Sequence, residues 1–355
     1  MPPVSASPDL TPHGPETPEP ETQGPETASS SALYDALAES VLGGGAHLTR
    51  SQVADATGVD LDRLTTLWRA LGFPSPGPDE ALFVDADIQA IGQLSALLDS
   101  GLLDVEDEGA MVRTMGRTFA RLADWEIAQL APQLAALGEP DSPAAPDVAA
   151  AALLGIVTDF LPMIQNLQDY VWRRHLVGAA GRALLAGDRA GVDLAVGFAD
   201  IVNFTRTSRK LTTAELGALV ETFEATATEV IAGHGGRVIK TIGDEVLFVC
   251  DSPTAAAWIA IDLAQRHSVD ETFPELRVGL AYGPVLARLG DVFGEVVNIA
   301  ARLTSLARPG TVLVNGELAA LLADDFRVRR APTERVRGYS RLETWALRPG
   351  DRDRS

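Results

Sequence analysis

Residues 194–202 read LAVGFADIV and place apolar side chains on both faces of an extended strand. A strand of this kind lies in the interior of a sheet, because both of its faces must be buried. Helical patterns dominate the chain before residue 190, whereas short β-rich runs alternate with helices after it. We therefore expect a domain of mixed strands and helices to begin near residue 190.

The next runs predict a helix and a hairpin. A capping-box pattern that begins at Thr212 opens a long helix with one apolar stripe. The runs RVIKTI (237–242) and EVLFVC (245–250) then flank Gly243 and Asp244, which predicts a hairpin with a tight turn.

Three later elements complete the order of this domain. A helix, a strand pair and a second helix are predicted at residues 253–267, 276–287 and 296–306. The resulting order is βαββαβ, which is the ferredoxin-like arrangement. The expected fold class is therefore α+β, with an all-α half in front of the mixed domain.

The N-terminal half begins with a pair of helices. A capping box opens at Thr49, Gly58 ends that helix, and a second helix starts at Asp60. The pair resembles a helix-turn-helix, but residues 49–72 carry three acidic and three basic side chains and so have no net charge. Contact with nucleic acid is therefore disfavoured.

Composition bounds the class of protein. The 355 residues include 49 acidic and 29 basic side chains, a formal net charge of -20, which opposes binding to phosphate backbones. The single cysteine, Cys250, excludes an intrachain disulfide and indicates a reducing compartment. The apolar run 148–160 is too short to cross a bilayer, and residues 1–30 lack the features of a signal peptide. A cytoplasmic protein without a transmembrane segment is expected.

Changes in composition divide the chain into five segments. These are a disordered Pro-rich acidic tail, a helical domain, a helical coupling segment, the mixed domain and a short disordered tail, at residues 1–30, 31–146, 147–190, 191–348 and 349–355. The Pro-rich run 140–146 marks the break between the helical domain and the coupling segment.

Two carboxylates stand where strands end. Asp200 ends the central strand, and Asp244 lies at the tip of the predicted hairpin. The β-α-β-β order can bring both to one end of the sheet, where paired carboxylates can hold a hard cation such as Mg²⁺. A Gly-Asp turn is also common without any metal, so a purely structural role for Asp244 is the alternative.

Four other polar residues are candidates for a site. Asn298 and Arg302 stand four residues apart on a predicted helix and project from one face. Arg277 opens a predicted strand, and Arg337 lies in the run VRGYS. Simple exposure to solvent is the alternative for each of them.

Three motifs occur in order in the mixed domain. They read FADIVNFT, VIKTIGDEVLF and GDVFGEVVNIAARL, at residues 198–205, 238–248 and 290–303. They resemble the signatures of the class III nucleotidyl cyclase catalytic domain, and the resemblance extends over about residues 192–348. It implies an adenylate cyclase that converts ATP to 3′,5′-cyclic AMP and pyrophosphate.

The resemblance also implies a role for each candidate residue. Asp200, Asp244 and the carbonyl of Ile201 would bind two divalent cations, Mg²⁺ or Mn²⁺, and Arg277 would bind the triphosphate. The partner chain of a homodimer would supply Lys240 and Asp291 for the adenine, Asn298 for the ribose, Arg302 for the transition state and Arg337 for phosphate.

The implied mechanism and substrate follow from charge. The cations would acidify the 3′-hydroxyl, and Arg302 would meet the charge that develops at the α-phosphorus. Lys240 as donor and Asp291 as acceptor complement adenine, so ATP is expected to be preferred over GTP. The chain departs from the family at Asn203, where Gly is frequent, and at Arg337, where Lys is common.

Residues 33–182 resemble the helical regulatory domain joined to some actinobacterial cyclases, for which responses to pH and lipids have been described. The resemblance rests on TGVDLDRLTTLWRALGFP (57–74) and YVWRRHL (170–176). It implies a proton, lipid or small-molecule effector, and His175 is a candidate because histidine titrates near neutrality. An exposed or structurally bonded His175 is the alternative.

Several other functions compete with this interpretation. One is a catalytically weak cyclase fold that only responds to nucleotide, one is a guanylate cyclase, and one is a transcription factor built on the helix-turn-helix. A diguanylate cyclase has a related fold and a GGDEF turn, but residues 242–246 here read IGDEV.

Overall fold

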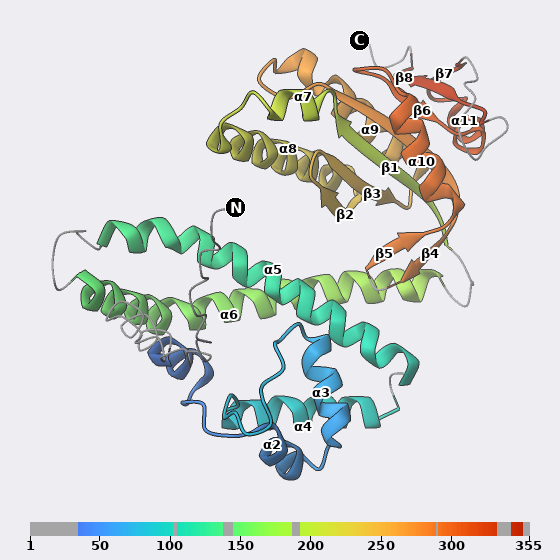
Figure 1. Ribbon diagram of the computed structural model, residues 1–355. Helices are drawn as coiled ribbons and strands as arrows, with labels where there is room; N and C mark the ends of the chain where they lie inside the picture. The colour runs from blue at the N-terminus through green and yellow to red at the C-terminus, as the bar shows by residue number, and fades with distance from the viewer. Residues whose placement is uncertain are drawn as a thin grey trace, which may run out of the picture. The chain divides into compact units, whose positions relative to one another are not determined.

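A computed structural model describes residues 35–101, 105–137, 145–186, 192–288, 290–331 and 342–350 (Figure 1). The chain divides into two compact units, Met1–His175 and Leu176–Ser355. The division falls inside a long helix, α6. No helix in the described ranges combines the length and the hydropathy that a membrane span requires.

The first unit is built from helices. Their bounds are α2 Arg50–Thr57, α3 Leu61–Ala70, α4 Asp85–Asp99, α5 Val105–Leu137 and α6 Ala145–Ala186, of which α6 continues into the second unit. The predicted caps are confirmed: Thr49 and Gln52 form the capping box of α2, and Gly58 ends α2 with a φ of 70°. Pro162 lies inside α6, which extends over 42 residues.

The second unit holds the described sheet and the helices that cover it. Its first elements are β1 Val192–Ile201, α7 Phe204–Ser208, α8 Thr213–Gly233, β2 Arg237–Ile242, β3 Glu245–Cys250, α9 Pro253–Val269 and β4 Leu276–Arg288. Its later elements are β5 Asp291–Phe293, α10 Glu295–Leu306, β6 Val312–Val314, α11 Gly316–Leu322, β7 Arg327–Arg330 and β8 Trp345–Arg348.

The strand order confirms the ferredoxin-like prediction. The order is β2-β3-β1-β4-β6-β8-β7, and β1 pairs antiparallel with both β3 and β4. The central position of β1 was expected from its apolar faces, and residues 194–201 are all buried. Gly243 allows the tight turn between β2 and β3 with a φ of 64°.

Two hydrophobic clusters pack on opposite faces of this sheet. One cluster joins the strands to α8, α9 and α11 through side chains such as Phe223, Ile259 and Leu318. The other joins them to α10 through Val296, Ala300 and Leu303. Since side chains alternate along a strand, the even-numbered residues of β1 face α10.

The prediction for residues 276–287 was wrong in one respect. The sequence indicated a strand pair, but β4 is one continuous strand of 13 residues, whose last part pairs with β5. Gly283 and Pro284 lie within β4 and suggested a turn, yet Gly283 is opposite Leu194 in the ladder with β1. Extended pairing with β1 outweighs the local turn signal here.

Candidate active site

Three charged side chains form a row across the central strands. Asp200 on β1 lies opposite Glu245 on β3 and opposite Arg277 on β4. The Nε of Arg277 donates to Oδ2 of Asp200 at 2.6 Å, and its Nη2 lies 2.5 Å from the same oxygen. Asp200 is only 9% exposed, so the fold holds this carboxylate in one place at the end of β1.

The second predicted carboxylate lies beside the first. The backbone N–H of Ile201 donates to the carbonyl of Asp244 at 3.0 Å, which joins the hairpin turn to the end of β1. Burial raises the pKa of Asp200, Arg277 lowers it, and the neighbouring Asp244 raises it further, so that it lies above the ordinary 3.8. The structure therefore brings Asp200, Ile201, Asp244 and Arg277 together, as the sequence predicted.

Glu245 belongs to this cluster and was not predicted. Burial and the charges of Asp200 and Asp244 raise its pKa to about 7, against the opposing effect of Arg277. Its place next to Asp244 was visible in the sequence, but only the ladder with β1 shows that it shares a face with Asp200.

A cavity opens next to these groups. Its volume is about 500 Å³, and it is lined by Asp244, Arg277, Ala307, Pro309 and residues 201–206. The described ranges hold no group of three or more His, Cys, Asp and Glu side chains placed to bind one metal ion. Two carboxylates that repel each other beside an open cavity nevertheless suit a hard cation, because Mg²⁺ uses one or two protein carboxylates and completes its shell with water and phosphate.

Asn203 borders this cavity in an unusual conformation. Its φ of 59° is left-handed, and it is the one residue other than glycine with a positive φ in the described ranges. Asparagine adopts this conformation more readily than most residues. The departure from the family's frequent Gly is therefore compatible with the backbone that the position requires.

The two predicted base-reading residues are paired with each other. The Nζ of Lys240 on β2 donates to Oδ2 of Asp291 on β5, and their side chains are 38% and 29% exposed. Burial raises the pKa of Asp291, but the hydrogen bonds from Lys240 and from the N–H of Val292 and the charge of Lys240 lower it more. Asp291 is therefore a carboxylate at neutral pH.

Asn298 and Arg302 lie on the solvent face of α10. Both are exposed, whereas Val296, Ala300 and Leu303 of the same helix are buried against the sheet. In the described part of the chain, no hydrogen bond or ion pair joins Asn298, Arg302, Lys240 or Asp291 to the carboxylates of Asp200 and Asp244. The candidates thus form two sets within one chain.

Two small residues that were not predicted set the position of α10. A Cβ on Gly279 of β4 would collide with the backbone of Ala300 and Thr304. The buried hydroxyl of Thr304 lies 3.2 Å from the carbonyl of Phe198 and 2.9 Å from that of Ala300. Both features hold α10 against the strands that carry Asp200 and Arg277, and a glycine inside a strand was the available signal.

Two predicted residues contribute no described contact. Arg337 lies outside the described residues. His175 is exposed on α6, and the described residues contain no hydrogen bond or ion pair to its ring.

Comparisons with known proteins identify the family of this chain. The family described as Adenylate and Guanylate cyclase catalytic domain matches residues 190–349, and the family described as Adenylate cyclase regulatory domain matches residues 26–175. An adenylate cyclase of Streptomyces coelicolor is 44% identical over 295 residues, which are 82% of this chain and 75% of that protein.

Two further relatives align over most of both lengths. An adenylate cyclase of Glutamicibacter nicotianae is 36% identical, and the alignment spans 89% of this chain and 82% of that protein. A pH-sensitive adenylate cyclase of Mycobacterium tuberculosis is 31% identical, and the alignment spans 83% of this chain and 76% of that protein. The chain therefore belongs to the family of adenylate cyclases in which a regulatory domain precedes the catalytic domain.

Proposed function

We propose that the chain is an adenylate cyclase that converts ATP to 3′,5′-cyclic AMP and pyrophosphate. The observation that carries the proposal is the pair of carboxylates, Asp200 and Asp244, which lie with Arg277 at the cavity described above. Relatives that align over most of the chain are named adenylate cyclases, which supports the same substrate.

Divalent cations are part of this proposal. Asp200, Asp244 and the carbonyl of Ile201 would hold two of them, either Mg²⁺ or Mn²⁺. When bound, they acidify the ribose 3′-hydroxyl and neutralise charge on the triphosphate. Arg277 already pairs with Asp200, so its guanidinium is in place to bind a phosphate oxygen next to the cations.

A homodimer would complete the site. One chain carries both residue sets, but among the described residues no hydrogen bond or ion pair joins one set to the other. A symmetric pair of chains would bring the sets together at two equivalent sites. In that arrangement Arg302 meets the charge that develops at the α-phosphorus, Asn298 binds the ribose, and Arg337 binds phosphate.

Lys240 and Asp291 would select the base. Lysine offers a donor to a ring nitrogen of adenine, and the aspartate accepts from its amino group. Guanine presents the opposite pattern at these positions and would form neither hydrogen bond. Because the two residues are ion-paired with each other in this structure, adenine would replace that pair by two hydrogen bonds of its own.

The test is cyclic nucleotide formation by the purified full-length chain with Mn²⁺, from ATP and from GTP, at acidic and neutral pH. We expect cyclic AMP from the parent and none from Asp200→Ala. Cyclic GMP formed in excess of cyclic AMP would identify a guanylate cyclase instead. Equal activity of the parent and the variant would contradict the proposed cation site.

We infer that the N-terminal unit regulates the catalytic unit through α6, which belongs to both. Protons are one candidate effector, because a relative is named pH-sensitive and His175 lies on α6, two residues after Arg173, which pairs with Asp169. The ratio of activity at acidic and neutral pH tests this. An unchanged ratio in His175→Ala would exclude His175 from the response.

A further inference from the structure

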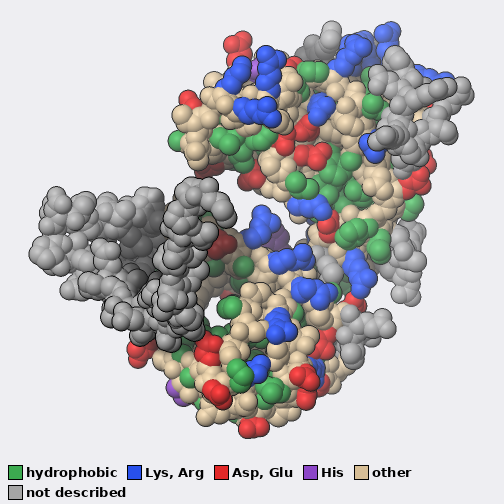
Figure 2. All heavy atoms as spheres, in the orientation of Figure 1, with side chains coloured by type: hydrophobic (Ala, Val, Ile, Leu, Met, Phe, Trp, Pro, Cys, Tyr) green, Lys and Arg blue, Asp and Glu red, His purple; other side chains and the backbone are tan. Residues whose placement is uncertain are grey.

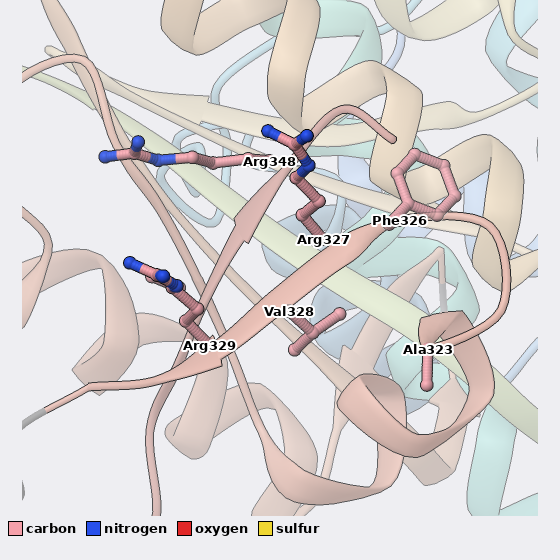
Figure 3. Close-up of a pocket in the computed structure, with 7 residues that line it drawn as sticks. Ala323, Phe326, Arg327, Val328, Arg329 and Arg348 are labelled. Atoms are coloured by element: carbon pink, nitrogen blue, oxygen red, sulfur yellow. The ribbon is translucent and has the colours of Figure 1, made fainter. Parts of the chain in front are cut away.

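A second cavity lies in the catalytic unit at the edge formed by β7 and β8. Its volume is about 640 Å³, and it is lined by apolar side chains and by three arginines, Arg327, Arg329 and Arg348 (Figure 3). It shares no residue with the cavity beside Asp244 and Arg277. The apolar part of the lining comes from Ala323, Phe326, Val328 and Ala346.

The register of the two strands concentrates positive charge on one face. Arg327 of β7 lies directly opposite Arg348 of β8, and Arg329 is opposite Ala346. Arg327 and Arg329 are two residues apart, so both project from the same face of β7. Figure 3 shows the side chains of Arg329 and Arg348 extending in the same direction from the two strands.

The pairing of Arg327 with Arg348 places two positive charges directly across the ladder. Like charges directly opposite each other on paired strands destabilise a sheet. The chain as a whole has a net charge of -20, so this cluster of arginines is a local positive region in an acidic protein. Figure 2 shows Lys and Arg side chains along the edge of the unit where Figure 1 places β7 and β8.

The arginine on the opposite face of β7 differs from this cluster, because it pairs with a carboxylate. Arg330 alternates with Arg329 and donates from Nη2 to Oε1 of Glu343 at 2.6 Å. In the described part of the chain, no carboxylate pairs with Arg329 or Arg348. The two acids that precede β7, Asp324 and Asp325, are not among the residues that line the cavity.

The spacing of the guanidinium groups suits more than one phosphate. Arg327 and Arg329 are about 7 Å apart along the strand, and Arg348 faces the first of them. Each guanidinium offers a planar fork that binds two oxygens of one phosphate. All three side chains are exposed, so an anion reaches them from solvent.

We propose that this cavity, bounded by β7, β8 and the end of α11, binds a linear di- or triphosphate, either free or as the phosphate chain of a nucleotide. The site is separate from the proposed catalytic site, and it does not depend on the cyclase activity. Arg329 and Arg348 are the residues that would contribute most.

The test is binding of pyrophosphate to the full-length chain, measured by isothermal titration calorimetry at constant ionic strength with a chelator that removes divalent cations. ATP and inorganic phosphate are titrated in parallel to separate a nucleotide from a free diphosphate and from a single phosphate. We expect saturable binding of pyrophosphate or ATP with one site per chain, and much weaker binding of phosphate.

Matched variants locate the site. Arg329→Gln and Arg348→Gln should each raise the Kd about tenfold, and the double variant should show no measurable binding. Arg330→Gln removes the same charge from the opposite face and should bind like the parent. Arg277→Gln should also bind like the parent, because it alters only the catalytic cavity. The melting temperature measured without ligand shows whether each variant is folded. If the double variant does not fold, the two single variants are sufficient for the test.

Other outcomes would overturn the proposal. Absence of saturable binding to the parent, or binding that survives in both single variants, would show that the arginines form no site. An equal loss in Arg330→Gln would indicate a general effect of net charge. Loss in Arg277→Gln alone would place the anion in the catalytic cavity.

Discussion

The ammonium nitrogen of Lys240 lies 2.5 Å from a carboxylate oxygen of Asp291 in the same chain. The two residues are 51 positions apart in the sequence, one on β2 and one on β5. Their pairing fixes both side chains in the free chain, and it removes the cost of leaving either charge without a partner.

Reversal of the pair should change the choice of base. In Lys240→Glu with Asp291→Cys, the acid accepts from guanine and no longer donates to adenine. We expect the ratio of kcat/KM for ATP over GTP to fall by about 10² or more. Lys210→Glu makes the same Lys-to-Glu replacement at an exposed position and should leave the ratio as it is. An unaltered ratio in the double variant would refute the assignment of the base.

Loss of Arg302 should act on the rate. Arg302→Ala removes an exposed guanidinium from α10 and leaves the buried face of the helix intact. A transition-state donor of this type contributes a factor of about 10² to 10³, so kcat should fall by that amount with little change in stability. Arg330→Ala is the control for loss of an exposed arginine in the same unit, and a similar decrease there would contradict a specific role.

Asn203 should tolerate glycine but not a β-branched residue. Its φ of 59° costs most residues about 1 to 2 kcal/mol, whereas glycine adopts it freely. Asn203→Val should therefore lower the free energy of unfolding by about that amount relative to Asn203→Gly, as measured by urea unfolding. Equal stability of the two variants would show that the position relaxes to a negative φ.

Gly279 should link packing to activity. A methyl group at this position would collide with the backbone of α10 at Ala300 and Thr304, so Gly279→Ala must displace the helix that bears Asn298 and Arg302. We expect a loss of about 1 to 3 kcal/mol in stability and a decrease in kcat in the variant that still folds.

A second glycine provides the comparison for this effect. Gly217 lies on α8, and a Cβ there would meet no atom within 4 Å. Gly217→Ala should keep full activity and should not lose stability, since alanine favours helix. A fully active Gly279→Ala would show that α10 can move without effect on the reaction.

Local patterns were sufficient to predict much of this fold. The apolar faces of β1, the Gly243 turn and the capping box of Thr212 each involve neighbours in the sequence, and each was confirmed. The candidates Asp200, Asp244 and Arg277 came together because they end or begin paired strands.

Features that depend on register could not be predicted in this way. Glu245 joins the site through the ladder of β3 with β1, and Gly279 has its role because α10 crosses β4 at that point. The continuity of β4 through Gly283 and Pro284 depends on pairing with a distant strand, which local turn signals do not report. The arginine face of β7 and β8 likewise arises only when the two strands align.

The strand order sets how firmly each part of the proposed site is held. β1 lies between β3 and β4, whereas β2 ends the sheet and β5 pairs with the far part of β4. Amide hydrogens of β1 should exchange with deuterium only when the whole domain opens, while those of β2 and β5 exchange through local opening. Asp200 is thus attached to the slowest-exchanging strand, and Lys240 and Asp291 to faster ones. Mild destabilisation of the catalytic unit should consequently reduce discrimination between ATP and GTP before it stops cyclisation.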